Sequence, residues 1–346
     1  MASLPIHAID TDALVIGAGP VGLFQAFQLG LQGIACHLVD ALPHAGGQCA
    51  ELYADKPIYD IPGIPVCTGR ELIERLTRQI APFKPTFHLG QTVEALQATE
   101  DGRWHVETNT GSAWTAKTVF IAAGVGAFVP RSLPIEGLAP HLGHQIWFGS
   151  QNLPNFAGQH LLVCGDSDTA LQTCLDAAGT AASVTLMHRR EQFSAEAPRT
   201  EAFASAQATG RVRFVAGQPT GLVLENGQLT ALEYLNAEGD TVAQPCEQLV
   251  MALGLSPKLG PVAQWGLQIE RKQLVVSTDT FATSASGIFA VGDINTYPGK
   301  KKLILCGFHE ATLAAFGAAA LLWPEAKTLL QYTTTSTTLH QRLGLI

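Results

Sequence analysis

Charged residues are scarce in this sequence. Asp, Glu, Lys and Arg make up 14% of its 346 residues, against about 25% in ordinary globular proteins. Their charges sum to −8, which argues against a nucleic-acid-binding protein, because phosphate contacts require a basic face. Membranes gain no electrostatic attraction for such a chain either. Hydrophobic residues reach 47%, so we expect a globular chain of about two domains.

The seven cysteines include no Cys-x-x-Cys pair. Their odd number and wide spacing argue against a disulfide framework and indicate reduced thiols, as in a cytoplasmic protein. The N-terminal residues lack the positive flank and apolar run of a secretory signal. His141 and His144 have no third candidate ligand nearby in the sequence, so no metal site is predicted.

Residues 13–36 form an uncharged run that is long enough for a membrane span. Five glycines, one proline and three glutamines interrupt it. The order of residues instead predicts a strand, a tight turn and a helix, so we expect no membrane segment here.

A nucleotide-binding pattern begins with the buried strand predicted at 13–16. The turn GAGPVG follows it, and a second strand at 34–39 ends in Asp40. In such a turn Gly17 allows the sharp bend, Gly19 lets the backbone approach a pyrophosphate, and Gly22 lets helix and strand pack closely. Asp40 would accept hydrogen bonds from ribose hydroxyls and repel a 2′-phosphate, so the pattern favours FAD or NAD over NADP.

A second copy of this pattern runs through the strand 161–164, the turn GDSDTA and the strand 184–187. Gly17 to Asp40 and Gly165 to His188 both span 23 positions, which indicates an internal duplication. The fold class is therefore α/β with two Rossmann-like (three-layer ββα) domains. The candidate NADP(H) contacts in this copy are Gly165, Asp168, Thr169, His188, Arg189 and Arg190, because two guanidiniums at the ribose edge match a 2′-phosphate.

The second turn departs from the pattern at two positions. Ser167 stands where a glycine is expected, and Asp166 places a carboxylate beside the expected pyrophosphate. A like-charge pair at ~4 Å costs about 4 kcal/mol at an effective dielectric of ~20. We therefore expect Asp166 to point away from the ligand, or NADPH binding to be weak.

Other segments complete the expected organisation. We interpret 86–107 and 112–123 as a β-appendage of the first domain and 212–242 as one of the second. Candidate linkers are 124–134 and 282–287. The buried strand 288–291 ends in Gly292-Asp293, at the strand end where open α/β sheets bind ligands.

Further motifs carry a family resemblance. They are GGQCAELY (46–53), IYDIPG (58–63), IAAGVGAFVPR (121–131), MHRREQF (187–193), SGIFAVGDI (286–294), YPGKKKLI (297–304), GFHEA (307–311) and YTTTSTTL (332–339). Together with the first turn they resemble, over nearly the whole chain, the ferredoxin–NADP reductases of the thioredoxin-reductase-like type. Thioredoxin reductase itself needs a Cys-x-x-Cys, which this sequence lacks.

The resemblance implies an FAD-binding domain at 1–127 and 288–346, with an NADP-binding domain at 128–287 inserted into it. It implies that Tyr53 stacks on one flavin face and Tyr332 on the other. It also implies a homodimer whose C-terminal tail can cover the partner's flavin. FAD would be held by Gly17, Gly19, Gly22, Asp40, Gln48, Tyr53, Val93, Phe128, Asp293 and Thr334.

The implied function is FAD-dependent electron transfer between NADPH and ferredoxin, or flavodoxin, without a redox disulfide. Flavin suits this task because hydride carries two electrons whereas an iron–sulfur carrier takes one. Docking of an acidic carrier requires a local basic patch, and the candidates are Arg70, Arg75, Arg78, Lys300, Lys301 and Lys302. Two alternatives stay open: an NADPH-dependent reductase of quinones or small acceptors, and a flavin-binding module without catalysis.

Overall fold

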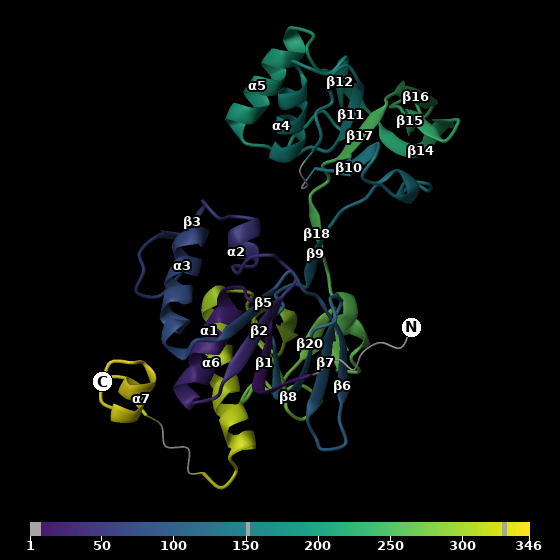
Figure 1. Ribbon diagram of the computed structural model, residues 1–346. Helices are drawn as coiled ribbons and strands as arrows, with labels where there is room; N and C mark the ends of the chain where they lie inside the picture. The colour runs from purple at the N-terminus through teal and green to yellow at the C-terminus, as the bar shows by residue number, and fades with distance from the viewer. Residues whose placement is uncertain (1–7, 150–152, 327–330) are drawn as a thin grey trace. The chain divides into compact units, whose positions relative to one another are not determined.

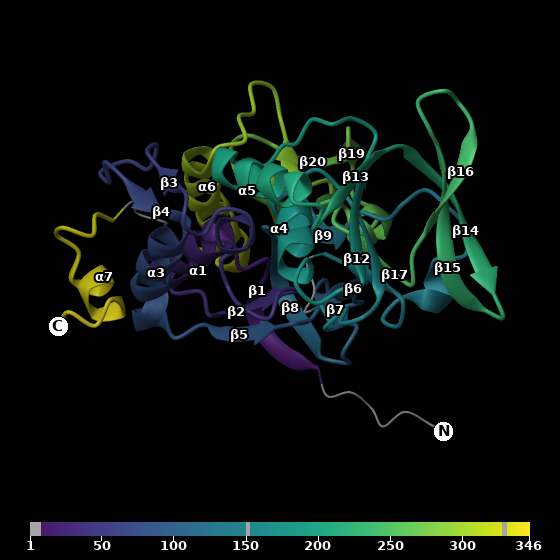
Figure 2. The ribbon, with the colours of Figure 1, turned by 90° about the horizontal axis from the view of Figure 1, so that it is seen from above.

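The structure is a computed structural model that describes residues 8–149, 153–326 and 331–346. The chain forms two compact units (Figure 1, Figure 2). Unit 1 comprises Met1–Ala127 and Lys258–Ile346, and unit 2 is the inserted segment Phe128–Pro257. The strands β9 (Ala127–Pro130) and β18 (Leu255–Lys258) pair with each other where the chain leaves and re-enters unit 1.

Unit 1 is built on a seven-stranded sheet with the order β5-β2-β1-β8-β7-β6, and β21 also pairs with β8. The strands β5, β2, β1, β8 and β21 are parallel, whereas β6 and β7 are antiparallel. The parallel strands read as continuous apolar runs because both faces of the sheet are covered. Their bounds are β1 Ile9–Ile16, β2 Cys36–Asp40, β5 Thr86–Leu89, β6 Val93–Ala98, β7 Trp104–Thr108, β8 Ala113–Ile121 and β21 Ile288–Ala290.

Helices α1, α3 and α6 pack together beside this sheet (Figure 1). α6 is long and apolar enough to cross a membrane, but Ala311, Ala314, Ala315 and Ala318 on it are buried within unit 1, and these small side chains allow close packing against α1. The helices are α1 Pro20–Gln32, α2 Gln48–Glu51, α3 Gly69–Ile80, α6 Ile304–Leu322 and α7 Thr337–Arg342, with short 3-10 turns at η1 Ala81–Phe83, η3 Gly260–Gln264 and η4 Gly292–Ile294.

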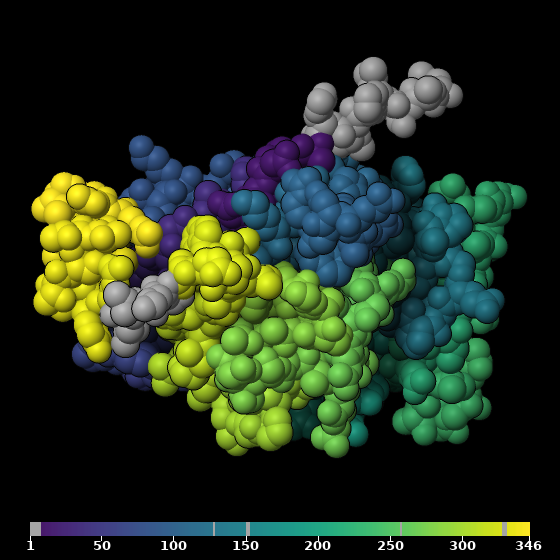
Figure 3. Space-filling model, turned by 90° about the horizontal axis from the view of Figure 1, so that it is seen from below, coloured from purple at the N-terminus to yellow at the C-terminus, as the bar shows by residue number. Residues whose placement is uncertain are grey.

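The C-terminal helix α7 packs at the end of α1. The Arg342 guanidinium donates a hydrogen bond to the Leu31 carbonyl, and the space-filling view shows the yellow atoms of this segment beside the purple and dark blue atoms (Figure 3). Small sheets complete unit 1: β3 Pro57–Ile58 with β4 Cys67–Thr68, and β19 Ile269–Glu270 with β20 Gln273–Val275 and β22 Asn295–Thr296.

Unit 2 repeats the parallel architecture with the order β10-β17-β11-β12-β13. Two helices, α4 (Asp168–Ala177) and α5 (Ala197–Ala208), pack against each other. A separate antiparallel sheet has the order β14-β15-β16. The bounds are β10 Ile146–Phe148, β11 His160–Cys164, β12 Ser183–His188, β13 Arg213–Ala216, β14 Gln218–Glu225, β15 Gln228–Leu235, β16 Thr241–Pro245, β17 Gln248–Met251 and the 3-10 turn η2 Ala139–His141.

The two units repeat the same backbone hydrogen bonds around their glycine turns. In unit 1 the Gly17 amide donates to the Val39 carbonyl at 2.8 Å, and in unit 2 Gly165 donates to Met187 at 3.1 Å. The neighbouring strand is tied equivalently, because Ala122 donates to Ile16 and Ala252 donates to Cys164, each at 2.8 Å. The fold is therefore α/β with two Rossmann-like domains, as predicted.

Several expected boundaries differ from the structure. Residues 258–287 lie in unit 1, not in the inserted unit, because Leu274 and Phe281 are buried in the core of unit 1. The expected linker 282–287 is therefore wrong: Ala282 forms a bridge with Phe289. The expected appendage at 86–107 and 112–123 is wrong, since β5, β6, β7 and β8 all belong to the seven-stranded sheet. The expected appendage at 212–242 is smaller than predicted, since β13 belongs to the main sheet of unit 2.

A pair of half-buried histidines predicts a pH effect on unit 1. His37 Nδ1 and His88 Nε2 lie 2.9 Å apart, and the edge of His88 packs against Trp114. Burial lowers the pKa of both residues from 6.5, and the charge of His88 lowers the pKa of His37 further. Near pH 6.5 and below, the unfolded chain therefore binds more protons than the folded chain. The stability that these neutral histidines allow above pH 6.5 is lost as the pH falls.

We expect the free energy of unfolding, measured by urea denaturation, to fall between about pH 7.5 and about pH 5.5. His88→Gln should weaken this dependence because it leaves one histidine to titrate. The exposed His144→Gln is the control and should leave the dependence unchanged. A pH dependence that is equal in His88→Gln and the unsubstituted protein would contradict this account.

Candidate functional site

The three glycines of the first turn differ in why glycine is needed at each position. At Gly17, where φ is +110°, an added Cβ would lie 2.4 Å from the Ala122 carbonyl oxygen, and at Gly22 it would lie 1.9 Å from the Gly17 oxygen. At Gly19 the nearest atom would be the Gly47 Cα at 3.8 Å, which is ordinary contact. The protein therefore requires glycine at Gly17 and Gly22, whereas Gly19 leaves open space for a ligand beside the N-terminus of α1.

This helix end can bind a phosphate. Gly19 is the N-cap of α1 and offers no side chain to cap the first N–H groups. Free N–H groups and the positive end of the helix dipole together form an anion site. Pro20 begins the helix, where its missing N–H removes no helical hydrogen bond. The open space at Gly19 and the uncapped helix end together fit a pyrophosphate.

Asp40 lies beside this turn at the end of β2. Its Oδ2 accepts a hydrogen bond from the Ala18 amide at 2.6 Å, and its Oδ1 accepts one from the Leu42 amide at 2.8 Å. Burial raises the pKa of Asp40, while these two hydrogen bonds lower it. Because a carboxylate has about four acceptor positions, the side chain can still accept from ribose hydroxyls.

The buried Val93 starts the strand that follows the 90–92 segment. Gln91 donates its amide hydrogen to the Asp40 carbonyl at 2.9 Å, and Gly90 donates to the Leu42 carbonyl at 2.8 Å. The chain just before Val93 therefore lies directly beside Asp40, and both residues are among those that the resemblance implies for FAD.

Gln48 and Asp293 meet although they are far apart in the sequence. The Gln48 side chain lies near enough to the Asp293 carboxylate to lower its pKa. The Gly46 amide donates to the Ala18 carbonyl at 2.9 Å, which joins the turn before α2 to the first glycine turn. Burial raises the pKa of Asp293, whereas Lys300 and Lys302 lower it. Three predicted cofactor segments are thus brought to one place in unit 1.

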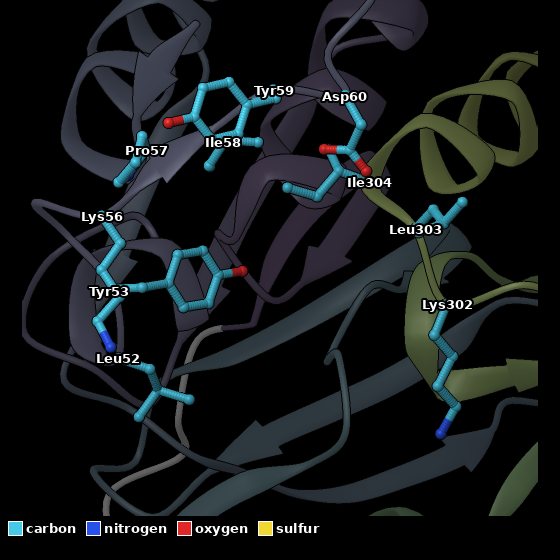
Figure 4. Close-up of a pocket in the computed structure, with 10 residues that line it drawn as sticks. All are labelled: Leu52, Tyr53, Lys56, Pro57, Ile58, Tyr59, Asp60, Lys302, Leu303 and Ile304. Atoms are coloured by element: carbon cyan, nitrogen blue, oxygen red, sulfur yellow. The ribbon is translucent and has the colours of Figure 1, made fainter. Parts of the chain in front are cut away.

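Tyr53 lines an open pocket of about 590 Å³ in unit 1 (Figure 4). Its ring enters the pocket from the side of α2, with Lys302 and Leu303 on the opposite side. The Cys49 thiol donates to the Tyr53 hydroxyl at 3.6 Å, and burial raises the pKa of this hydroxyl. The lining residues are Leu52, Tyr53, Lys56, Pro57, Ile58, Tyr59, Asp60, Lys302, Leu303 and Ile304.

The C-terminal tail does not join this pocket in the single chain. The Tyr332 side chain is 65% exposed, Thr334 is also exposed, and neither lines the pocket. Phe128 lies in β9, and its side chain is outside the described residues. The two tyrosines expected to hold a flavin between them are therefore not assembled by one copy of the chain.

The turn of unit 2 is equally constrained at its first glycine. A Cβ at Gly165 would lie 2.3 Å from the Ala252 carbonyl oxygen, as at Gly17 of unit 1. The Asp166 carbonyl accepts from the Ser194 amide at 2.9 Å, which ties the turn to the segment after β12. The Asp168 Oδ1 accepts from the Glu196 amide at 3.0 Å. Thr169 follows in the first turn of α4 and is exposed.

The basic end of β12 also lies at the surface. His188 Nδ1 is 2.9 Å from the Arg190 carbonyl oxygen, and this contact folds the chain back after the strand. Arg189 and Arg190 are exposed, and within the described part of the chain neither guanidinium forms an ion pair. Two free cations at this position match the predicted site for a 2′-phosphate.

One expected docking residue is wrong. Lys300 was predicted on an exposed basic patch, but its side chain is 7% exposed and its Nζ lies 2.5 Å from Glu310 Oε1. Glu310 was not predicted to matter at all, and its side chain is fully buried. No sequence pattern shows which of three consecutive lysines turns inward, because the buried partner is a single glutamate in a mostly apolar helix. Lys301 and Lys302 remain exposed.

Comparison with known proteins identifies the family that this chain matches. Residues 11–311 match the model of the pyridine nucleotide-disulphide oxidoreductases. The chain is 55% identical to a ferredoxin–NADP reductase of Paracidovorax citrulli (strain AAC00-1), over 97% of each chain. It is 56% identical to a ferredoxin–NADP reductase of Acidovorax sp. (strain JS42), over 96% of this chain and 95% of that one.

Solved structures agree on the fold. Thioredoxin reductase of Lactococcus lactis matches with a TM-score of 0.59 at 22% identity, over 91% of this chain and 99% of that chain. The bacillithiol disulfide reductase of Staphylococcus aureus matches with a TM-score of 0.64 at 13% identity, over 92% of this chain and 100% of that chain. At these identities the likeness concerns architecture alone.

The glycine contacts predict different effects at two neighbouring positions. Gly19→Ala should leave the free energy of unfolding nearly unchanged but weaken FAD binding about tenfold or more, because the new methyl group fills the ligand's space. Gly22→Ala should instead destabilise unit 1, because its Cβ would lie 1.9 Å from the Gly17 oxygen. FAD titration and urea denaturation of both variants separate the two effects. Unimpaired FAD binding by Gly19→Ala would be inconsistent with a pyrophosphate at this turn.

Proposed function

This chain belongs to the pyridine nucleotide-disulphide oxidoreductases and, within them, to the ferredoxin–NADP reductases, and from this premise we propose that it passes electrons from NADPH to ferredoxin through FAD. The observation that carries the proposal is the pair of equivalent glycine turns that end in opposite charges. In unit 1 Asp40 ends the strand that follows the turn and its helix. In unit 2 Arg189 and Arg190 directly follow the equivalent strand. The first suits the ribose of FAD and the second the 2′-phosphate of NADPH.

The residues of unit 1 fit FAD. The open space at Gly19 admits a pyrophosphate, Asp40 has acceptor capacity for the ribose, and Asp293 lies at a strand end beside Gln48. Tyr53 offers an aromatic face for stacking in the pocket. Bound FAD supplies the conversion between a two-electron donor and a one-electron acceptor.

The residues of unit 2 select and orient NADPH. Arg189 and Arg190 bind the 2′-phosphate through forked hydrogen bonds. Asp168 holds the start of α5 by accepting from the Glu196 amide, which keeps the N-terminus of α4 in place for the pyrophosphate. The Asp166 carboxylate would oppose the phosphates, so it must point away from this ligand or NADPH binding is weak.

Cysteines take no part in the proposed electron path. All seven are unpaired, and burial raises the pKa of the Cys49 thiol, the one in contact with Tyr53. A thiol is a poor nucleophile, because thiolate is the reactive form. Electrons therefore leave the flavin for the carrier directly, without a dithiol. Seven unpaired thiols also support a cytoplasmic location.

We propose in addition that the protein acts as a homodimer. Tyr332 is 65% exposed on the C-terminal tail and does not line the pocket of its own chain. A large aromatic side chain in this state is suited to contact with a second copy. In the dimer, Tyr332 and Thr334 of one copy would cover the flavin of the other.

The reaction predicts a visible change on mixing with NADPH. Under anaerobic conditions the yellow protein should be bleached rapidly, and oxidised ferredoxin should restore the colour. Turnover with quinones but not with ferredoxin or flavodoxin would favour a reductase of small acceptors. A protein that stays yellow with NADPH would be a flavin-binding module without catalysis.

The matched variant is Arg189→Ala with Arg190→Ala. It should raise the NADPH concentration needed for half-maximal bleaching by about tenfold or more, because two charge-assisted contacts to the 2′-phosphate are lost. NADH, which lacks this phosphate, is the control substrate. The NADH concentration needed for half-maximal bleaching should stay nearly constant. An equal loss with both nucleotides would show that the arginines do not read the 2′-phosphate.

Ferredoxin docking predicts a dependence on salt and on the lysines beside the pocket. Lys302→Glu should lower kcat/KM for ferredoxin about three- to tenfold at low salt, because it reverses a charge at the rim. The difference should shrink at high ionic strength. Lys272→Glu, an exposed lysine that does not line the pocket, is the control. Rates with ferredoxin that respond neither to salt nor to Lys302→Glu would exclude docking at this rim.

A further inference from the structure

A buried carboxylate in α6 accepts hydrogen bonds from four groups of the described structure. Glu310 is fully buried. Its Oε1 accepts from Lys300 Nζ at 2.5 Å and from the Tyr297 hydroxyl at 2.9 Å. Its Oε2 accepts from the Gly292 amide at 2.7 Å and from Asn295 Nδ2 at 2.8 Å. Four donors compensate a charge that would otherwise be costly to bury.

Both members of this ion pair hold the same residue. Glu310 accepts from the Gly292 amide, and Lys300 Nζ donates to the Gly292 carbonyl at 2.8 Å. Gly292 has a φ of +80°, a region that favours glycine. The peptide groups on both sides of Gly292 are therefore fixed, and with them the direction in which Asp293 leaves the strand.

Packing joins this turn to the first glycine turn. An added Cβ at Gly307, in the first turn of α6, would lie 2.4 Å from Val21 Cγ2 and 3.4 Å from the Gly292 Cα. Val21 itself is in the first turn of α1. The start of α1, the start of α6 and the Gly292-Asp293 turn therefore form one closely packed group.

We propose that Lys300 and Glu310 are positioning residues for FAD, acting through Gly292 to hold Asp293 in its binding geometry; this rests on the proposed function. Neither side chain lies where it would contact the cofactor directly, since Glu310 has no exposed surface and Lys300 almost none. An apolar pair would cost less to bury than these charges. It could not, however, satisfy the buried N–H group of Gly292, which donates to Glu310 and must be paired. It would also remove the Lys300 donor from the Gly292 carbonyl, leaving that oxygen with the Asn295 amide alone.

The test is a double-mutant cycle on FAD affinity, measured by titrating the flavin-depleted protein with FAD and following flavin fluorescence. Lys300→Met and Asp293→Ala should each weaken FAD binding about tenfold. If Lys300 acts through Asp293, the double variant should be no weaker than the poorer single variant. Independent effects would multiply to about a hundredfold and would overturn the proposal.

Matched variants separate positioning from general stability. Lys300→Arg keeps the charge and should retain most of the FAD affinity. Leu29→Ala removes a buried side chain elsewhere in unit 1 and should lower the midpoint of urea unfolding, because it leaves a cavity, without changing FAD affinity. If Leu29→Ala weakens FAD binding as much as Lys300→Met does, the pair has only a structural role.

Two further readouts keep the outcomes distinct. If Lys300→Met does not fold, Tyr297→Phe replaces it in the same cycle, because it removes a single hydrogen bond to Glu310. Binding of 2′,5′-ADP, a ligand for unit 2, should be unaffected by all these variants. If the unsubstituted protein binds no FAD, the proposed function fails; if it binds FAD and the losses multiply, only the positioning role fails.

Discussion

In each unit a glycine backbone packs against a carbonyl group of the neighbouring strand, and the nucleotide turns depend on this contact. A Cβ at Gly17 would lie 2.4 Å from the Ala122 oxygen, and one at Gly165 would lie 2.3 Å from the Ala252 oxygen. Because each glycine lies so close to this carbonyl, the chain turns sharply after the strand. The free N–H groups at the start of the following helix are then available to a ligand at the end of the strand. Both turns follow from this one steric constraint.

Charge then distinguishes two turns that share their backbone. In unit 1, Asp40 is hydrogen-bonded to the amides of Ala18 and Leu42, so its position is fixed before a ribose arrives. In unit 2, Arg189 and Arg190 are exposed at the equivalent strand end. One repeated architecture therefore carries an acidic strand end in unit 1 and a basic strand end in unit 2, on which the proposed preferences for FAD and NADPH rest. Glu310 and Lys300 both bind backbone groups of Gly292, contacts that no side-chain motif in the sequence predicts.

The parts of this fold that the sequence predicted are those with local patterns. The two turns were recognisable because glycines, strand ends and terminal charges recur at the same spacing. The linker at 282–287 was wrong because its small polar residues read as a loop, whereas the buried Phe281 anchors the segment in unit 1. Pairing of β5 and β8 with the parallel strands is non-local and leaves no mark in the sequence. The exposure of Lys300 was wrongly predicted for the same reason. Its partner, Glu310, lies ten residues away, and nothing in the sequence indicated that this glutamate is buried.

The central claim is that unit 1 holds one dinucleotide with a flavin in the space beside Gly19. The most direct measurement is the FAD content of the purified protein, released by denaturation and quantified by its absorbance. The account predicts about one FAD per chain, released intact because the binding is non-covalent. A colourless protein that also takes up no FAD on reconstitution would contradict it.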